Sequence, residues 1–457
     1  MKSKRQLFGT DGIRGEANIY PMTCEIATAL GRAVTHYFQS RSIRKKIGSP
    51  LIIIGKDTRL SCYMLEQAFS SGVCSQGGRV IFTGPLPTPG IAFVTKSMRA
   101  NAGVMISASH NIFSDNGIKI FNCHGHKLPD EVELELEDMI LNPTKIPAPL
   151  GENLGKATRL DEVIGRYIVH VKSAFNDEYK CEDLRIVLDC ANGAGYKVGP
   201  MIFRELGAEV FPIGVSPNGT NINKEIGSLY PSKAEEAVIN HRADIGICLD
   251  GDADRLVIID ENGKSLAGDI LIGIFAKLLL DQGKLKKGDE VVGTVMSNLA
   301  LEKYIKGLGL KFFRAQVGDR YILERMRDKN SKLGGEPSGH VIFHEHSSTG
   351  DGILAALKTI ECMKHFKKPL SQLAETVKLY PQIIKNVPVK KKPPMENNEI
   401  IQKALKKAVK ELGSKGRIVL RYSGTESLAR VMIEGEDPIL VTKLTDELSS
   451  AISLALT

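Results

Sequence analysis

Three aspartates, Asp250, Asp252 and Asp254, alternate within the segment DGDADR, which directly follows an apolar run. Carboxylates at this spacing in a glycine-containing loop can direct their oxygens at one hard cation. Without a cation their charges would repel one another and raise their pKa values. Magnesium is favoured over calcium if a phosphate supplies a further ligand, because magnesium commonly combines few carboxylates with phosphate oxygens. The segment therefore predicts a magnesium site.

A calcium-binding EF-hand loop is the competing interpretation of these aspartates, with Glu261 as its last ligand. Arg255, however, occupies the position where the sharp turn of that loop requires glycine. The following residues, Leu256–Ile259, are typical of a strand. These two features exclude an EF-hand.

A second polar loop, ISASHN, contains Ser109 and follows the apolar strand predicted at 103–107. Small hydroxyls and backbone N–H groups at a strand end lie where open α/β sheets bind ligands. The same residues would also suit an ordinary strand-to-helix turn. Lys119 lies in the next apolar run and is expected to place a positive charge near this loop.

A third loop, GGEPSGH, offers the carboxylate of Glu336, the hydroxyl of Ser338 and the imidazole of His340. These groups suit recognition of sugar hydroxyls, and the histidine could move a proton near neutral pH. A plain glycine and proline turn is the equal alternative.

A fourth loop, RYSGTESLAR, lies between strands predicted at 417–420 and 431–434. It combines guanidinium groups, hydroxyls and unhindered backbone, which together can hold a terminal phosphate. The residues concerned are Arg421, Ser423, Gly424 and Thr425.

Three further patterns are weaker. Cys123, His124 and His126 imitate a zinc cluster, but no second ligand pair follows at a usable spacing, so a turn is predicted. The glycine-rich segment 189–195 lacks the lysine and hydroxyl residue of a nucleotide-binding loop. Arg59 is predicted to be structural rather than catalytic.

These loops must be positioned by regular elements, and short β-branched runs alternate with amphipathic stretches along most of the chain. Strands are predicted at 51–55, 79–84, 103–107, 184–190 and 245–250, and helices at 25–40, 64–76 and 269–282. Nearly continuous apolar strands between helices indicate α/β layers in which both sheet faces are covered.

Proline-containing stretches at 142–153 and 380–397 are predicted to be linkers, and a weaker boundary falls at 260–264. We therefore expect three similar mixed-sheet α/β domains, at 1–155, 156–259 and 260–375. A smaller α+β domain of helix, hairpin and helix is expected at 376–457. Each domain contributes one of the four loops.

Composition narrows the functional classes. The 457 residues include 61 Lys and Arg against 53 Asp and Glu, and the resulting charge of +8 favours anionic small ligands. Basic runs without interleaved aromatic residues argue against nucleic acid. No apolar run could span a bilayer and no signal peptide is evident, so no membrane association and a cytoplasmic location are expected. Eight scattered cysteines indicate reduced thiols.

In this order, with LFGTDGIRG at residues 7–15, the four loops resemble the α-D-phosphohexomutase superfamily. The resemblance covers nearly the whole chain, and it implies four domains around one central cleft. FGTDGIRG together with ISASHN is similar to the branch that acts on glucosamine phosphates. The alternatives are a phosphomannomutase or phosphoglucomutase specificity and a non-catalytic phosphosugar-binding protein.

The resemblance implies a role for each loop. Ser109 would carry the transferred phosphate, and its oxygen would join Asp250, Asp252 and Asp254 on one Mg²⁺. Arg14 and Lys119 would flank the transferred group, with His340 or Lys119 moving a proton. The implied substrate contacts are Arg255, Glu336, Ser338, Arg421, Ser423, Gly424, Thr425 and Arg430.

The implied reaction interconverts glucosamine 6-phosphate and glucosamine 1-phosphate through glucosamine 1,6-bisphosphate, in the supply of UDP-N-acetylglucosamine for cell-wall synthesis. A phosphosugar is the expected partner, and a homodimer is compatible with the resemblance. Two departures stand out. Ile112 replaces a usual proline and is expected to loosen the serine loop. Pro337 replaces the glutamine common in that branch, which bears on the choice of sugar.

Overall fold

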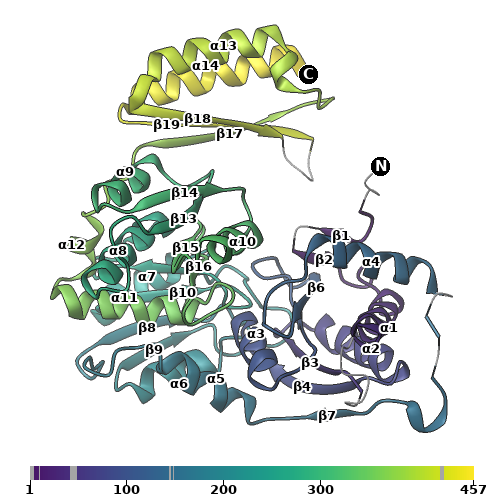
Figure 1. Ribbon diagram of the computed structural model, residues 1–457. Coiled ribbons are helices and arrows are strands. Elements are labelled where there is room, and N and C mark those ends of the chain that lie inside the picture. The colour runs from purple at the N-terminus through teal and green to yellow at the C-terminus, as the bar shows by residue number, and fades with distance from the viewer. Residues whose placement is uncertain are drawn as a thin grey trace.

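The computed structural model describes residues 5–9, 11–41, 49–143, 146–147, 149–422 and 427–456. Over these residues the chain forms three α/β units and a smaller C-terminal domain (Figure 1), which confirms the predicted fold class. None of the described helices combines the length and apolar character needed to cross a membrane.

The first sheet has seven strands. The central strands β3, β4 and β5 are parallel, whereas β6, β2 and β1 continue the sheet in antiparallel pairing. In order the strands are β1 (Phe8–Gly9), β2 (Gly12–Glu16), β6 (Asp115–Asn122), β5 (Ala102–Ile106), β3 (Leu51–Lys56), β4 (Arg79–Pro85) and β7 (Ala157–Arg159). β7 therefore belongs to this sheet although it follows residue 155, where the first domain was expected to end.

Four helices pack with the first sheet: α1 (Cys24–Ser40), α2 (Ser61–Ser75), α3 (Thr88–Ser97) and α4 (Asp130–Leu141). The backbones of α1 and α2 lie very close together. A Cβ on Gly31 would lie 2.2 Å from the Phe69 carbonyl oxygen, and a Cβ on Gly72 would lie 2.1 Å from the Thr28 carbonyl oxygen. Glycine at both positions thus permits backbone-to-backbone packing.

The second sheet has five strands in the order β12 (Ser265–Leu266), β11 (Leu256–Ile259), β10 (Ile245–Leu249), β8 (Arg185–Asp189) and β9 (Glu209–Ile213). Its helices are α5 (Val163–Lys172), α6 (Val198–Glu205) and α7 (Ser232–His241). β11 is the strand predicted after the aspartate loop, so the exclusion of an EF-hand is confirmed.

The third sheet has four strands in the order β14 (Lys311–Ala315), β13 (Glu290–Thr294), β15 (Leu333–Gly335) and β16 (Val341–Phe343). Its helices are α8 (Gly268–Asp281), α9 (Leu299–Gly307), α10 (Asp319–Lys329), α11 (Gly352–Phe366) and α12 (Leu370–Ala374). One apolar core runs from α3 of the first unit through the second unit to α8 and α11, so these three units pack as one body.

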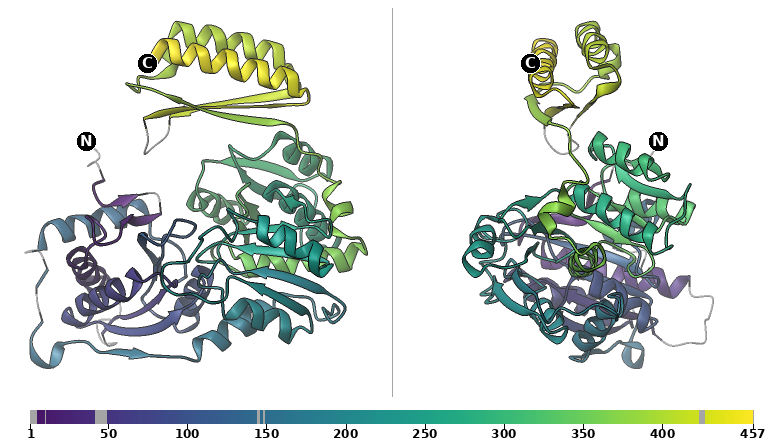
Figure 2. Two further views of the ribbon diagram at one scale, coloured as in Figure 1. Left: turned by 180° about the vertical axis from the view of Figure 1, so that it is seen from behind. Right: turned by 90° about the vertical axis from the view of Figure 1, so that its left-hand side faces the viewer.

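The C-terminal domain is an antiparallel sheet in the order β17 (Gln382–Pro388), β19 (Leu428–Gly435) and β18 (Gly416–Tyr422), covered by α13 (Glu399–Leu412) and α14 (Pro438–Leu456). It has its own apolar core. Figure 2 shows it at one end of the molecule, beside the third unit, where Arg417 donates to the carbonyls of Val295 at 2.8 Å and Ser297 at 2.9 Å. The segment 380–397 was predicted to be only a linker, and that prediction was wrong, because it contains β17. Pro388 is tolerated there because β17 is an edge strand.

Candidate functional site

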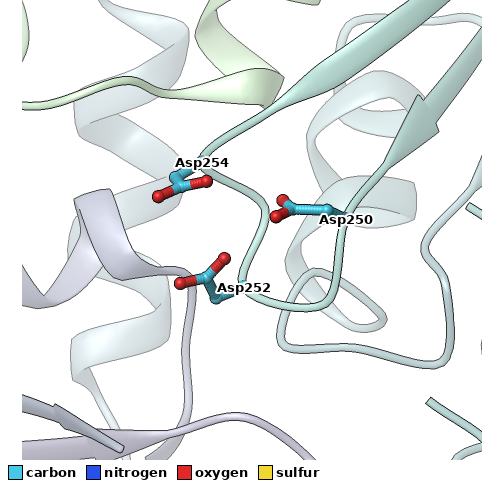
Figure 3. Close-up of side chains that lie close together, drawn as sticks. All are labelled: Asp250, Asp252 and Asp254. Atoms are coloured by element: carbon cyan, nitrogen blue, oxygen red, sulfur yellow. The ribbon is translucent and has the colours of Figure 1, made fainter. Parts of the chain in front are cut away.

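The aspartate loop joins β10 to β11, and Asp250, Asp252 and Asp254 are all buried in it. One oxygen from each lies within 4.8 Å of the others, and Figure 3 shows the three carboxylates around a common space. The Oδ1 atoms of Asp252 and Asp254 are buried and have no hydrogen-bond partner among the described residues. Oxygens in this state fit a hard cation, so the triad is consistent with a metal site.

Burial, followed by repulsion from the other two carboxylates, holds the pKa of Asp250 well above its ordinary value. Burial would also raise the pKa of Asp254, but Lys119 and His340 outweigh it and the pKa falls below the usual range. The triad thus contains one carboxyl group that resists ionisation and one that stays ionised.

Ser109 lies against this triad. Its Oγ donates to Asp250 Oδ2 at 2.6 Å, and its side chain is almost fully buried. The residue has a φ of 53°, in the left-handed region that non-glycine residues seldom adopt. The Ser109 amide donates to Ser107 Oγ at 2.9 Å, which helps to hold that conformation. A strained serine pointing at buried carboxylates is typical of a functional site rather than a plain turn.

Arg59 holds the serine loop in place. Its buried guanidinium donates to the carbonyls of Ser109 at 3.0 Å and Asn111 at 2.8 Å, and also to that of Ile112. Asn223 Nδ2 reaches the first two carbonyls as well, each at 2.8 Å. All these contacts are to the main chain, as expected of the structural role predicted for Arg59.

Lys119 is buried beside the metal loop. Its Nζ lies 2.8 Å from Asp252, 3.4 Å from Asp11 and 3.7 Å from Asp254. Burial opposes its charge, but the three carboxylates raise its pKa overall. Arg14 pairs with Asp11 and reaches the Ala108 carbonyl at 3.4 Å. Two permanent cations therefore face the space beside Ser109.

His340 is buried on the far side of the triad. Its Nδ1 lies 3.8 Å from Asp254 and its Nε2 3.7 Å from Asp319, while the Gly350 amide donates to Nε2 at 3.0 Å. Burial opposes protonation, but the nearby carboxylates raise the pKa of His340 overall. Because Nε2 accepts the Gly350 hydrogen, Nδ1 carries the proton of the neutral ring.

The third loop connects β15 to β16. The carboxylate of Glu336 is buried and accepts from the Gly318 amide at 3.1 Å, whereas Ser338 is exposed. Arg255 lies nearby, with Nη1 3.3 Å from His110 Nδ1 and Nε 3.9 Å from Asp254. Burial opposes the charge of Arg255, but carboxylates of the metal loop and Glu336 raise its pKa overall.

Arg421 and Arg430 are direct cross-strand partners on β18 and β19, and both line a small hollow of about 120 Å³. Partial burial, and then the charge of Arg430, lower the pKa of Arg421. Two neighbouring guanidinium groups form a setting for an anion. Ser423, Gly424 and Thr425 lie outside the described residues.

The sequence patterns missed several members of this site. Asp11 pairs with Arg14, Lys119 and Lys127, and Lys127 pairs with Asp319 at 2.7 Å. Thr88 Oγ1, at the start of α3, donates to Asp252 Oδ2 at 2.6 Å. Asp11 lies inside the LFGTDGIRG motif, so the motif could have identified it as a site residue. No sequence pattern pointed to Lys127, Asp319 or Thr88. Cys123 and His124 lie in a turn, as predicted, and among the described residues only the aspartates form a ligand cluster.

Four family descriptions match successive parts of the chain. They are phosphoglucomutase/phosphomannomutase alpha/beta/alpha domain I at residues 5–146, domain II at 165–263, domain III at 267–380 and the C-terminal domain at 384–451.

Curated relatives match at full length. A phosphoglucosamine mutase of Nitratidesulfovibrio vulgaris (strain DSM 19637 / Miyazaki F) is 49% identical over 451 residues, 98% of each chain. One of Pelobacter propionicus is 51% identical over 446 residues, 97% of each chain.

Solved structures share the fold. A phosphoglucomutase/phosphomannomutase family protein of Burkholderia thailandensis has a TM-score of 0.82 at 20% identity, over 98% of this chain and 97% of that one. An Aspergillus fumigatus N-acetylphosphoglucosamine mutase, solved with GlcNAc-6P and magnesium, has a TM-score of 0.70 at 18% identity, over 100% and 97% of the two chains.

Proposed function

Since this chain belongs to the phosphoglucosamine mutase family, we propose that it interconverts glucosamine 6-phosphate and glucosamine 1-phosphate through a phosphorylated Ser109. The observation that carries the proposal is the contact of Ser109 Oγ with Asp250 at 2.6 Å, inside a buried aspartate triad. A phosphate on this oxygen would lie beside the triad, Lys119 and Arg14. The glucosamine 1-phosphate formed would then serve the supply of UDP-N-acetylglucosamine for cell-wall synthesis.

The carboxylates of Asp250, Asp252 and Asp254 are proposed to hold Mg²⁺ together with a phosphoserine oxygen. The buried, unpartnered oxygens of Asp252 and Asp254 support this assignment, as does the magnesium in the fungal enzyme of the same fold. When bound, the metal would neutralise charge on the phosphoryl group. This chain's own residues would do the rest.

In the first transfer the Ser109 Oγ–P bond breaks as a substrate hydroxyl oxygen bonds to phosphorus, and the hydroxyl proton passes to a base. Lys119 and Arg14 stabilise the equatorial oxygens of the transferred group. His340 and Lys119 are the two candidates for moving this proton, and Asp11 and Asp252 hold Lys119 in its protonated form. The bisphosphate then turns end for end, and its 6-phosphoryl group returns to Ser109.

The non-reacting phosphate is assigned to Arg421 and Arg430 with Ser423, Gly424 and Thr425. Glu336, Ser338 and Arg255 are assigned to the sugar. A central cleft enclosing these groups, a homodimer and a cytoplasmic location remain predictions. The mass measured by light scattering tests the homodimer.

A coupled assay tests the function. Purified, magnesium-loaded protein with a bisphosphate primer should form glucosamine 1-phosphate faster than it converts glucose or mannose phosphates. S109A should abolish turnover while leaving the circular dichroism spectrum unchanged, and S114A in the same loop region should retain activity. Preference for glucose or mannose phosphate would indicate the other mutase specificities, which Pro337 in the sugar loop makes worth measuring. Absence of turnover on all three sugars would indicate a non-catalytic phosphosugar-binding protein.

A further inference from the structure

Five of the chain's ten histidines line one cavity of about 750 Å³ that is separate from the Ser109 loop and the aspartate triad. They come from the turn after β6, from α5 and from the segment after β16, so all three α/β units contribute. The five are His124, His126, His170, His344 and His346.

One wall of this histidine cavity is α3. The Phe93 ring stacks on the His170 ring with centroids 3.9 Å apart, and His170 Nε2 lies 2.9 Å from the His346 carbonyl. These contacts fix α5 between α3 and the segment after β16. The cavity is therefore a built junction of three domains, within the 300–1,000 Å³ typical of small-molecule sites.

Cations without ion-pair partners among the described residues surround the cavity. Lys96 and Arg327 line it, and the charge of Lys284 acts on His346. Two carboxylates also line it. Asp351 is already bonded to the Leu354 amide and the Tyr167 hydroxyl, both at 2.9 Å, whereas Glu345 is exposed. Lys96 and Arg327 are exposed like Glu345, and Lys284 adds a third positive charge nearby.

The imidazoles add hydrogen-bond donors rather than charge. Burial, with help from neighbouring cations, lowers the pKa values of His126 and His346 to about 4, so both rings are neutral near pH 7. A neutral ring offers one N–H donor and one acceptor nitrogen. The Nδ1 atoms of His126 and His344 are buried and have no partner among the described residues. Polar atoms in this state indicate a missing ligand or water.

We propose that the histidine cavity is a second ligand site, which binds a phosphate-bearing small molecule through Lys96, Arg327 and imidazole N–H groups. A transition metal is the competing occupant. The geometry disfavours it, because no three of these histidines bring ligand atoms within 4.8 Å of one another among the described residues, as the aspartate triad does. The unpaired cations would also repel a metal ion.

Both walls of the cavity are attached to the metal loop. At the start of α3, Thr88 Oγ1 donates to Asp252 Oδ2 at 2.6 Å. In the segment after β16, the Gly350 amide donates to His340 Nε2 at 3.0 Å, and the Gly352 amide donates to the Ala253 carbonyl at 3.0 Å. A molecule that bridges α3 and this segment would therefore hold together two elements that both bond to the metal loop or to His340 beside it.

Calorimetric titration of the full chain with inorganic pyrophosphate, in EDTA, tests the proposal. The background carries R421A and R430A, which removes the proposed phosphate cradle of the C-terminal domain. In this background the further change K96A/R327A should weaken binding about tenfold or more, since it removes two charge-assisted contacts. The matched control K367A/K368A removes two exposed cations from outside the cavity and should leave the affinity unchanged.

Histidine ring proton resonances provide a second readout, in which pyrophosphate should shift signals that disappear in H126Q and H344Q. Equal affinity in the cavity variant and the control would overturn the proposal. So would Zn²⁺ binding at one equivalent that H126Q/H344Q abolishes, in a protein that does not bind pyrophosphate. Neither readout uses mutase activity, so the outcome is independent of the proposed function.

Discussion

The Lys127 ammonium lies 2.7 Å from the Asp319 carboxylate and joins the first α/β unit to the third. Lys127 also pairs with Asp11, which contacts Lys119, while Asp319 lies 3.7 Å from His340. Lys119 and His340 both face Asp254. These six residues form a closed ring in which carboxylates alternate with basic side chains, and Asp254 connects the ring to the metal loop.

Removing Asp319 opens this ring. D319N should lower the free energy of unfolding by about 2 kcal/mol. This is less than the ~3–5 kcal/mol usual for a broken buried ion pair, because Lys127 still pairs with Asp11. It should also lower kcat, since His340 loses a neighbour. Urea unfolding and steady-state rates measure both effects. K127R should retain more of each than K127A, and equal losses in these two variants would contradict a role based on charge.

Arg59 sets the geometry of the serine loop. R59K keeps the charge but cannot donate to three carbonyls in a fixed fork, so kcat should fall by about a hundredfold through misplacement of Ser109. KM should change little, because Arg59 is not assigned to substrate. Rates measured on folded protein, checked by circular dichroism, test this prediction. A rise in KM with kcat unchanged would instead assign Arg59 to binding.

Asp269 predicts a pH dependence of stability. Burial raises its pKa to about 6, and its Oδ2 accepts from the Asn298 amide at 2.7 Å. Since the folded pKa exceeds the unfolded value, the native state loses stability as pH rises from about 4 to about 6, by about 2–3 kcal/mol.

The variant D269N should remove that loss. Relative to the unmodified chain it should gain stability at pH 7 compared with pH 4, as measured by urea unfolding at both values. D328N, at a side chain 63% exposed, is the matched control and should show no such gain. If D269N and the unmodified chain have parallel pH profiles, the buried carboxyl group does not titrate as described.

Arg421 and Arg430 should govern substrate affinity. Loss of one charge-assisted contact to a phosphate costs about 1.5–3 kcal/mol, so R421A and R430A should each raise KM by about 10–100-fold. K415A, an exposed cation just before β18, is the control for general electrostatic attraction. Equal effects of K415A and R421A would mean that the domain attracts phosphate only by its overall charge.

Local patterns predicted much of this molecule. Asp250, Asp252 and Asp254 are close in sequence, and a loop between two apolar strands leaves little choice about where their side chains gather. The strand β11 was predicted with its observed ends, because Leu256–Ile259 is bounded by polar turns.

Contacts between distant segments could not be predicted in the same way. Asp11 meets Lys127 across 116 positions, and Lys127 meets Asp319 across 192, so no periodicity or spacing relates them. The strand β17 was missed for a different reason. The prolines in and around this strand suggested a linker. On an edge strand, however, one side of the backbone is unpaired, so not every amide has to donate.

The guanidinium of Arg59 bonds to main-chain oxygens, which every amino acid possesses. The hydrogen bonds from Arg59 to residues 109, 111 and 112 therefore do not depend on which side chains these positions carry. Ile112, 58% exposed, can replace the family's usual proline, because Arg59 donates to the carbonyl of residue 112 whichever side chain is present. A substitution of residue 112 is therefore expected to disturb the serine loop less than a substitution of Arg59.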